Sequence, residues 1–343
     1  MSFQSAPRPY RTALAAEGQM PHSACRLVAI VVTHDRLAQL RRTLRRLLTE
    51  PDCHLERVVV VNNASTDGTA RWLDSLDMPR LDVLHLPHNM GGAGGFALGL
   101  EHARRAHDPD WVLLMDDDAR PFPGALAEFQ CSDLDGWDAI AAAAYTPQGG
   151  ICDTNRPTRD PFAQWSTLLR TLHAGREGFH LGPQAYANDT PVPIDGASFV
   201  GLFLSRRALE LAGLPDRNLF IYGDDAIYTM QLSRAGGRMV FLPRIRFEHD
   251  TTPVPDRAAG MQADWPVWKA YYLHRNALIL YRLAAGRLFW PICLIVMFRW
   301  ALRLHRFRGR RRIFLRLALR GIWHGLRGVT ATGHDTVLGW ARR

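Results

Sequence analysis

Short apolar runs alternate with helix-like segments along the first third of the chain, and this alternation constrains the fold more than any other feature. Residues 27–33 (LVAIVVT) form a continuous apolar run rich in β-branched residues, which is typical of a strand buried on both faces. The same pattern predicts strands at 58–61, 81–86 and 111–115 and helices at 37–48, 67–76 and 95–106. Such alternation through short links indicates a parallel sheet covered by helices. The expected fold class is α/β, with a mostly parallel central sheet flanked by helices.

The pattern becomes weaker beyond the fourth predicted strand. Residues 148–190 are polar and carry several prolines and glycines, so we expect loops that cover the site, with one helix at 165–172. The pattern returns at 197–204 and 219–222, and the remaining elements are predicted as a strand at 238–242 and helices at 206–212 and 225–235. No internal repeat is apparent.

Polar side chains directly follow three of the predicted strands. Thr33 ends the first strand, Asn62 and Asn63 follow the second, and Asp116–Asp118 follow the fourth. Open α/β sheets bind ligands beyond the carboxyl ends of their strands. We therefore expect a ligand site at this edge of the sheet.

The three aspartates predict a metal site. Alternate side chains of an extended segment point the same way, so Asp116 and Asp118 can face one cation together. Carboxylate oxygens suit Mg²⁺ or Mn²⁺, and three adjacent like charges are costly without a cation. The alternative is a solvated acidic turn or a helix N-cap before Pro121. We favour the metal because the three acids end a buried strand.

A glycine-rich segment, residues 88–96 (HNMGGAGGF), precedes a predicted helix. Its glycines let the backbone approach a ligand closely, and a helix N-terminus attracts phosphate. The segment lacks the GK[ST] ending of a P-loop and a true GxGxxG register. A tight turn without a ligand is the alternative reading.

Two features near the end of the predicted sheet add acid–base and ligand chemistry. Asp224 and Asp225 stand at a predicted helix start, where they could cap the helix or where one could serve as a general base. His249 follows a predicted strand. A lone histidine is more often structural than a ligand, although imidazole is acceptable to Mn²⁺.

In this order the motifs resemble inverting glycosyltransferases of family 2, which have the GT-A fold, over about residues 27–281. The generic features are VAIVVTHDR (28–36) and VVVNNASTDGT (59–69). The more specific ones are NMGGAGGFALGL (89–100), MDDDARP (115–121), GLPDRNLFIYGDDAIYTMQLSRAG (213–236) and YYLHRN (271–276). The chain looks most like bacterial galactofuranosyltransferases, with rhamnosyltransferases close behind.

The resemblance implies a role for each motif. Thr33 and Asn63 lie near the base and ribose of a nucleotide-diphosphate sugar donor, and Gly91, Gly92, Gly94, Gly95 and Asp117 belong to the same donor-binding group. Asp116 and Asp118 hold a Mn²⁺ or Mg²⁺ ion that bridges the donor diphosphate, and His249 completes the metal shell. Asp225 is the catalytic base, which takes a proton from an acceptor hydroxyl in a single inverting displacement.

The sequence also departs from these relatives. The large galactofuran polymerases carry an N-terminal β-domain, whereas residues 1–25 read as a short, flexible polar arm, so the chain looks more like the smaller initiating enzymes. Asn62 and Asn63 stand where many family 2 enzymes have an acidic pair, which leaves the nucleotide base open. The best guess for the donor is UDP-galactofuranose, and dTDP-rhamnose is the alternative.

The cysteines and the N-terminus indicate the compartment. The five cysteines are scattered without a CxxC pair, which favours a reducing compartment and argues against a structural zinc site. No secretory signal peptide is visible in the first residues. We expect a cytoplasmic protein.

The C-terminal residues differ sharply in charge from the rest of the chain. Residues 287–343 hold thirteen arginines and one acid, a net charge of +12, which leaves −3 for the rest of a chain whose net charge is +9. Residues 288–298 are apolar but about half as long as a bilayer-spanning helix. With aromatics between the arginines, the segment favours a helix lying on an anionic membrane surface. A packed terminal helix is the alternative, and we expect no nucleic-acid partner because no nucleic-acid module is present.

These readings divide the chain into a flexible arm (1–25), a GT-A domain (26–285) and a basic, membrane-associating helical tail (286–343). Within the domain, residues 26–120 form the nucleotide-binding half and 121–285 the acceptor half. The expected function is sugar transfer to a lipid-linked or polysaccharide acceptor in cell-envelope glycan synthesis, at the inner face of the cytoplasmic membrane. The alternatives are a rhamnosyltransferase, a non-catalytic sugar-nucleotide binding protein and a nucleotidyltransferase.

Overall fold

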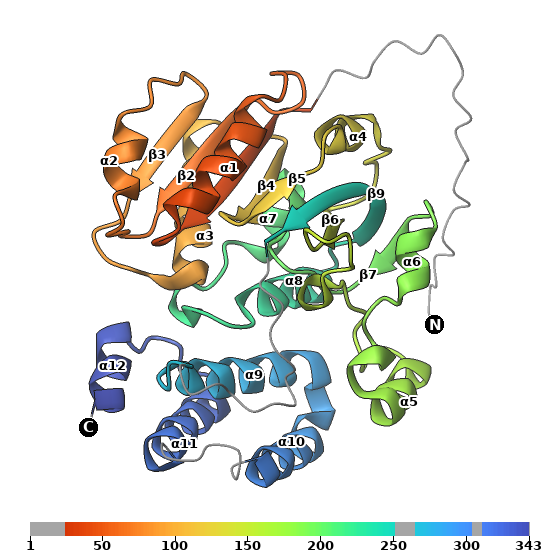
Figure 1. The fold of residues 1–343 in the computed structure, drawn as a ribbon. Helices are drawn as coiled ribbons and strands as arrows, with labels where there is room; N and C mark the ends of the chain where they lie inside the picture. Colours follow the sequence, from red (N-terminus) through yellow and green to blue (C-terminus); the bar gives the residue numbers. More distant parts are fainter. Residues whose placement is uncertain (1–24, 251–264, 304–310, 343) are drawn as a thin grey trace.

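The structure is a computed structural model that describes residues 25–250, 265–303 and 311–342. The predicted N-terminal arm lies outside the described residues except for Cys25. Figure 1 shows a central sheet with helices on both faces and a separate layer of C-terminal helices packed beside it. The predicted α/β class is confirmed.

The first half of the sheet is parallel, as predicted. Its strands lie in the order β3-β2-β1-β4 and all pair in parallel. They are β1 (Leu27–Thr33), β2 (Arg57–Asn62), β3 (Leu81–His85) and β4 (Trp111–Asp116), linked by the helices α1 (Leu37–Leu48), α2 (Thr69–Asp74) and α3 (Gly91–Ala106). Residues of β1 alternate between the two faces: Val31 belongs to the same core cluster as Leu44 of α1, and Ile30 to the same cluster as Leu100 of α3. The continuous apolar run therefore belongs to a strand covered on both faces.

The second half of the sheet is mixed. Its strands are β5 (Ala119–Pro121), β6 (Ala139–Tyr145), β7 (Val192–Ile194), β8 (Leu202–Ser205) and β9 (Met239–His249). Strand β8 is antiparallel to β4 and to β6, whereas β6 and β9 are parallel. The sequence pattern missed β6 because AIAAAAY is mostly alanine, which is depleted in strands. The predicted strand 238–242 continues to His249, and this extension brings the histidine to the site.

The remaining helices of the domain are α4 (Ala125–Cys131), α5 (Trp165–Ala174), α6 (Pro183–Ala187), α7 (Arg206–Ala212) and α8 (Asp224–Arg234). The helices predicted at 165–172, 206–212 and 225–235 correspond to α5, α7 and α8. Helix α8 begins at Asp224, one residue earlier than predicted, so both carboxylates of the pair lie in its first turn.

The C-terminal layer consists of α9 (Lys269–Ala285), α10 (Phe289–Arg303), α11 (Arg311–Arg327) and α12 (His334–Arg342). Within the described residues, the stretch 269–302 is long and apolar enough to cross a membrane, by length and composition only. Helix α9, however, buries Arg275 and Asn276 against the domain. Gly286, with φ +50°, separates α9 from α10. We therefore treat α9 as part of the folded domain.

Helix α11 packs closely on α9. A Cβ at Gly325 would lie 2.7 Å from the carbonyl oxygen of Arg275, so glycine is needed for this approach. Phe314, Leu317 and Val337 are buried in the same contact. The helices α11 and α12 thus follow the packed alternative. Helix α10, in contrast, exposes Trp290, Leu294, Ile295, Phe298 and Leu302 on the surface.

Candidate active site

The sheet register brings His249 to the acidic cluster. Strand β4 ends at Asp116, and β5 starts at Ala119, which pairs with His249 of β9. The backbone N–H of Asp250 donates to the carbonyl oxygen of Asp118 at 2.8 Å. As a result, Nε2 of His249 lies 3.1 Å from Oδ1 of Asp118. Residues 131 positions apart in sequence are therefore adjacent.

One ligand atom each from Asp116, Asp118 and His249 lies within 4.8 Å of the others, which is close enough for a shared cation. Nδ1 of His249 lies 2.8 Å from Oδ1 of Asn155, so this ring nitrogen carries the hydrogen and Nε2 faces the carboxylates. Metal-bound histidines are typically held in this way through their second nitrogen. The donor set of two carboxylates and one oriented imidazole fits Mn²⁺ or Mg²⁺.

The carboxylates are crowded and partly shielded from water. Burial and the neighbouring Asp118 raise the pKa of Asp116 to about 7. Burial raises the pKa of Asp117 to about 6. Burial alone would lower the pKa of His249, but the hydrogen bond and charge of Asp118 outweigh it and raise this pKa to about 10. The crowded carboxylates thus favour a positive charge beside them, and a divalent cation bound by neutral His249 would supply one.

Arg36 also offsets these charges. Its guanidinium forms an ion pair with Asp118 and lies 3.5 Å from Oδ1 of Asp117. Its side chain is half exposed, whereas the two carboxylates are buried. The motif 28–36 ends in this arginine, but sequence reasoning gave it no role. Asn155 was missed as well, because it stands in the polar stretch where the sequence shows no pattern.

Thr33 and Asn63 lie at the predicted edge of the sheet, and both are buried. The Thr33 hydroxyl donates to Oδ2 of Asp117 at 2.7 Å. The amide of Asn63 donates to the carbonyl oxygen of Gly91 at 3.0 Å, and its Oδ1 accepts from the backbone N–H of Met90 at 2.8 Å. Both side chains therefore organise neighbouring parts of the site, and their contact with a nucleotide stays a prediction.

The glycine-rich segment is helical, which corrects the predicted loop. Helix α3 begins at Gly91, four residues before the predicted start. A Cβ at Gly94 would meet Met90, and one at Gly95 would lie 2.5 Å from Cγ1 of Val32, so these two glycines serve close packing. At Gly92 a Cβ would lie 3.8 Å from Oδ2 of Asp224. Gly92 is thus the glycine that borders the acidic pair.

Asp224 and Asp225 are half-buried in the first turn of α8. Burial and the charge of Asp225 raise the pKa of Asp224, and burial raises the pKa of Asp225. The charge of Asp116 also raises the pKa of Asp224. Oδ1 of Asp225 accepts from the backbone N–H of Ala226 at 2.7 Å. Asp224 therefore borders Gly92 and is close enough to Asp116 to be influenced by its charge.

Helix α9 holds the loop that precedes this pair. Arg275 is fully buried, and it donates to the carbonyl oxygens of Asn218 and Leu219 at 2.8 and 3.0 Å. Its guanidinium also lies over the rings of Tyr271 and Tyr272. The motif YYLHRN thus gains a physical role as the anchor of the loop in front of α8.

The comparisons with known proteins agree with this geometry. Residues 28–186 match the Glycosyl transferase family 2 domain. Galactofuranosyltransferase GlfT1 of Mycobacterium tuberculosis is 32% identical over 213 residues, which cover 61% of this chain and 64% of GlfT1. Undecaprenyl-phosphate mannosyltransferase of Micrococcus luteus is 28% identical over 232 residues, covering 64% of this chain and 82% of the relative. The chain thus spans just under two thirds of the length of GlfT1.

Solved structures share the fold at low sequence identity. TarS 1–349 of S. aureus in complex with UDP-GlcNAc has a TM-score of 0.53 at 14% identity, covering 92% of this chain and 87% of that one. GalNAc-T7 with UDP, GalNAc and Mn²⁺ has a TM-score of 0.54 at 16% identity, covering 76% of this chain and 48% of that one. The family resemblance drawn from the sequence motifs is confirmed. Residues 28–186 thus match the family 2 glycosyltransferase domain, and the chain shares its fold with solved glycosyltransferases of the GT-A type.

Proposed function

We propose that the protein transfers a sugar from a nucleoside diphosphate donor to a lipid-linked glycan acceptor, with inversion at the anomeric carbon. The observation that carries this proposal is the meeting of two acidic groups at one site. Asp116 and Asp118 lie with His249 at the end of β4, and Asp224, next to Asp225, borders Gly92 at the start of α3 and is influenced by the charge of Asp116. A non-catalytic binding protein would not need Asp224 and Asp225 in addition to the metal ligands. The mechanism of a nucleotidyltransferase likewise assigns no role to this pair on α8.

The donor is proposed to be UDP-galactofuranose. The galactofuranosyltransferase GlfT1 is among the relatives, and TarS and GalNAc-T7 were solved with UDP or a UDP-sugar. A dTDP-rhamnose donor is the alternative. Mn²⁺ or Mg²⁺ held by Asp116, Asp118 and His249 would offset the charge of the leaving diphosphate.

Protein side chains are proposed to carry out the proton transfer and to position the donor. The Asp225 carboxylate accepts the proton of the acceptor hydroxyl as that oxygen attacks the anomeric carbon, and the bond to the diphosphate breaks on the opposite face. Asp224, nearer Gly92, lies on the donor side of the pair. Arg36 can leave its carboxylate partners for the donor diphosphate, because its side chain is half exposed. Thr33 and Asn63 keep Asp117 and the start of α3 in place.

The acceptor is proposed to be carried by a membrane lipid, so the protein would work at the inner face of the cytoplasmic membrane. The basic C-terminal region, the exposed apolar side chains of α10 and the undecaprenyl-phosphate relative support this proposal. Liposome flotation of the parent protein tests it, with and without anionic lipid. Recovery should fall as salt rises and in a W290S/L294S/F298S variant. Recovery that depends neither on lipid charge nor on these side chains would contradict membrane association.

A panel of nucleotide sugars tests the reaction. With Mn²⁺ present, we expect UDP-galactofuranose to be hydrolysed slowly and to raise the melting temperature, as a ligand of the folded state must. Asp118→Asn should lose both effects, and the exposed control Asp77→Asn should keep them. A response to dTDP-rhamnose alone would select the rhamnosyltransferase. Binding without any turnover would select the non-catalytic protein.

A further inference from the structure

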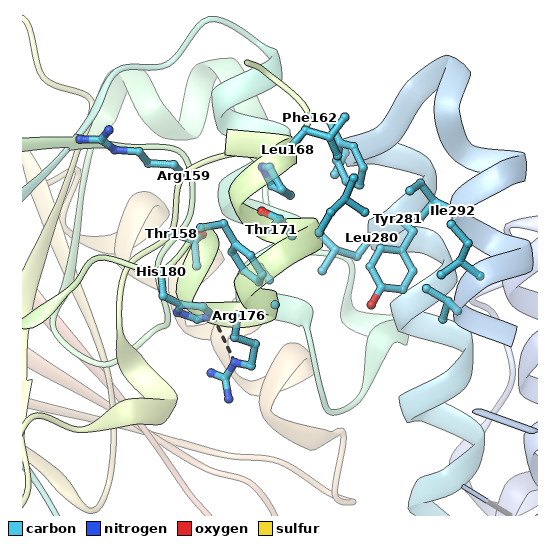
Figure 2. Close-up of a pocket in the computed structure, with 18 of the residues that line it drawn as sticks. Thr158, Arg159, Phe162, Leu168, Thr171, Arg176, His180, Leu280, Tyr281 and Ile292 are labelled. Atoms are coloured by element: carbon cyan, nitrogen blue, oxygen red, sulfur yellow. Dashed lines mark hydrogen bonds between the residues drawn. The ribbon is translucent and has the colours of Figure 1, made fainter. Parts of the chain in front are cut away.

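A cavity of about 580 Å³ lies between α5, α9 and α10, apart from the metal-binding cluster. Figure 2 shows Leu168 and Thr171 of α5 on one side and Leu280, Tyr281 and Ile292 of α9 and α10 on the other. Most of its lining is apolar, including Phe162, Leu172 and Val296. Its size is that of a small-molecule site, roughly 300–1,000 Å³. The proposed reaction, which needs a metal, a donor and a base, leaves this cavity unused.

The cavity extends to the first turn of α8, beside the proposed catalytic pair. Ala226 and Met230 of α8 form part of its wall. Ala226 directly follows Asp225, and its backbone N–H donates to Oδ1 of that carboxylate at 2.7 Å. A ligand in the cavity would therefore lie beside the residue that follows Asp225.

The charge of the lining is one-sided. Arg159, Arg176 and Arg299 line the cavity, and none of the described residues that line it is acidic. Arg176 also contacts His180, with Nε 3.3 Å from Nε2, as Figure 2 shows. In Figure 2 the guanidinium groups of Arg159 and Arg176 point away from the apolar side chains, so they lie at the rim of the cavity. Guanidinium groups at the rim of an apolar cavity suit a phosphate ester joined to a hydrocarbon chain.

The helices α5 and α10, which form walls of the cavity, also expose apolar side chains. Trp165 and Leu169 of α5 are 75% and 62% exposed, and Leu294 and Phe298 of α10 are 69% and 65% exposed. Both helices lie at the end of the molecule away from β3, as Figure 1 shows. Exposed apolar patches of this kind mark interaction surfaces, here at the outer edge of the cavity. The sequence predicted such a surface for the C-terminal region but not for α5.

We propose that this cavity binds the first part of the hydrocarbon chain of the phosphate-linked lipid acceptor, with α5 and α10 as its walls toward the membrane. This inference rests on the proposed function for the identity of the ligand. Beyond the proposed function, the inference gives the binding site of the lipid and assigns α5 a role as one wall of that site. The lining arginines contact the phosphate group, and the carbohydrate end of the acceptor lies by Asp225.

The test uses farnesyl phosphate as a soluble probe, with farnesol and inorganic phosphate as comparisons. Binding to the full chain is measured by calorimetry below the concentration at which the probe forms micelles. Farnesyl phosphate should bind about tenfold or more tightly than either comparison ligand, because it alone satisfies both the apolar wall and the arginines. Equally tight binding of inorganic phosphate would overturn the proposal, because the hydrocarbon chain of farnesyl phosphate would then contribute nothing to the affinity.

Two variants on opposite walls locate the probe. Val296→Trp fills the cavity from α10 and Thr171→Trp fills it from α5, so each should weaken farnesyl phosphate binding about tenfold or more. Leu294→Trp, on the exposed face of α10, is the matched control and should bind as the parent does. Arg299→Gln should weaken the binding of farnesyl phosphate but not of farnesol. If either filling variant that retains its helical content binds as the control does, the assignment is wrong.

Binding of UDP with Mn²⁺ is measured on the same samples. It should be unchanged in all four variants, because none of the substituted residues touches the metal cluster. A parent protein that binds UDP but not farnesyl phosphate disproves the lipid site alone. A parent protein that binds the probe but not UDP disproves the proposed donor and leaves the cavity assignment standing.

Discussion

The side-chain amide of Asn276 donates to the carbonyl oxygen of Tyr222 at 2.8 Å, two residues before Asp224. It also lies 3.0 Å from the carbonyl oxygens of Leu219 and Ile221. Tyr222 has φ +69°, a conformation that non-glycine residues rarely adopt unless their surroundings impose it. Helix α9 therefore holds a strained loop that aims the first turn of α8 at the site.

Asn276→Ala should lower kcat by about tenfold or more, since misplacing a catalytic group by a small distance is costly. It should also reduce the free energy of unfolding by roughly 1–3 kcal/mol, because buried carbonyls lose their donor. Binding of UDP with Mn²⁺ should change little. The exposed control Asn188→Ala should behave as the parent. A variant that loses stability but keeps its full kcat at a temperature where it is folded would refute the positioning role.

Asp225→Asn should reduce transfer by about 10²–10⁴-fold, the usual contribution of a general base, while donor affinity is retained. The same variant should be more stable at neutral pH. A carboxyl whose pKa is raised by folding opposes folding once the pH exceeds its unfolded value, and the amide removes that cost. Steady-state kinetics and thermal unfolding on one sample check both effects. Equal loss of donor binding would instead make Asp225 a donor or metal ligand.

The rate of transfer should fall on the acid side of the pH profile with an apparent pKa higher than that of an ordinary aspartate. The base works as a carboxylate, and burial raises the pKa of both Asp224 and Asp225. Transfer should therefore increase with pH and level off above an apparent pKa that belongs to the pair and exceeds the ordinary value of about 4. In Asp224→Asn this fall should move to lower pH, since one source of repulsion is gone. A fall near pH 4 in the parent would contradict the raised pKa.

The glycines of α3 should separate into two kinds. Gly95→Ala should destabilise the protein, because its Cβ would lie 2.5 Å from Val32 in the core. Gly92→Ala has room in the fold, and alanine favours a helix by up to about 1 kcal/mol, so stability should be kept or improved. If Gly92 borders the donor, transfer should fall in this variant. Denaturant unfolding and transfer rates of the pair of variants distinguish packing from function. Full activity of Gly92→Ala would remove this glycine from the site.

The parts of the fold that follow from local pattern were predictable. Residues 27–33 and 37–48 match β1 and α1 to the residue, because apolar period and burial coincide there. Strand β6 was missed because its alanine-rich sequence gives no strand signal, and it is held by its neighbours in the sheet. The early start of α3 was missed because glycines disfavour helices, whereas here close packing requires them.

In the site as well, the local features were predictable from the sequence and the long-range contacts were not. The three aspartates were visible at a strand end, but the distance between His249 and Asp118 depends on a strand pairing that no local pattern encodes. Asn155, which orients His249, lies in a stretch without periodicity. The motif YYLHRN was noted only through the family resemblance, and the sequence predicted neither the burial of its arginine nor the carbonyl groups that it contacts. Long-range contacts, more than local structure, were what the sequence left undetermined.

Calorimetric titration of the full chain with UDP, with Mn²⁺ or with a chelator, tests the central claim that Asp116, Asp118 and His249 bind a metal that in turn binds the donor diphosphate. The account predicts clear binding with Mn²⁺, loss of about tenfold or more in affinity with the chelator, and the same loss in Asp118→Asn and His249→Ala. Asp77→Asn should bind as the parent does. UDP that binds equally well with the chelator, or equally well to Asp118→Asn, would contradict the account.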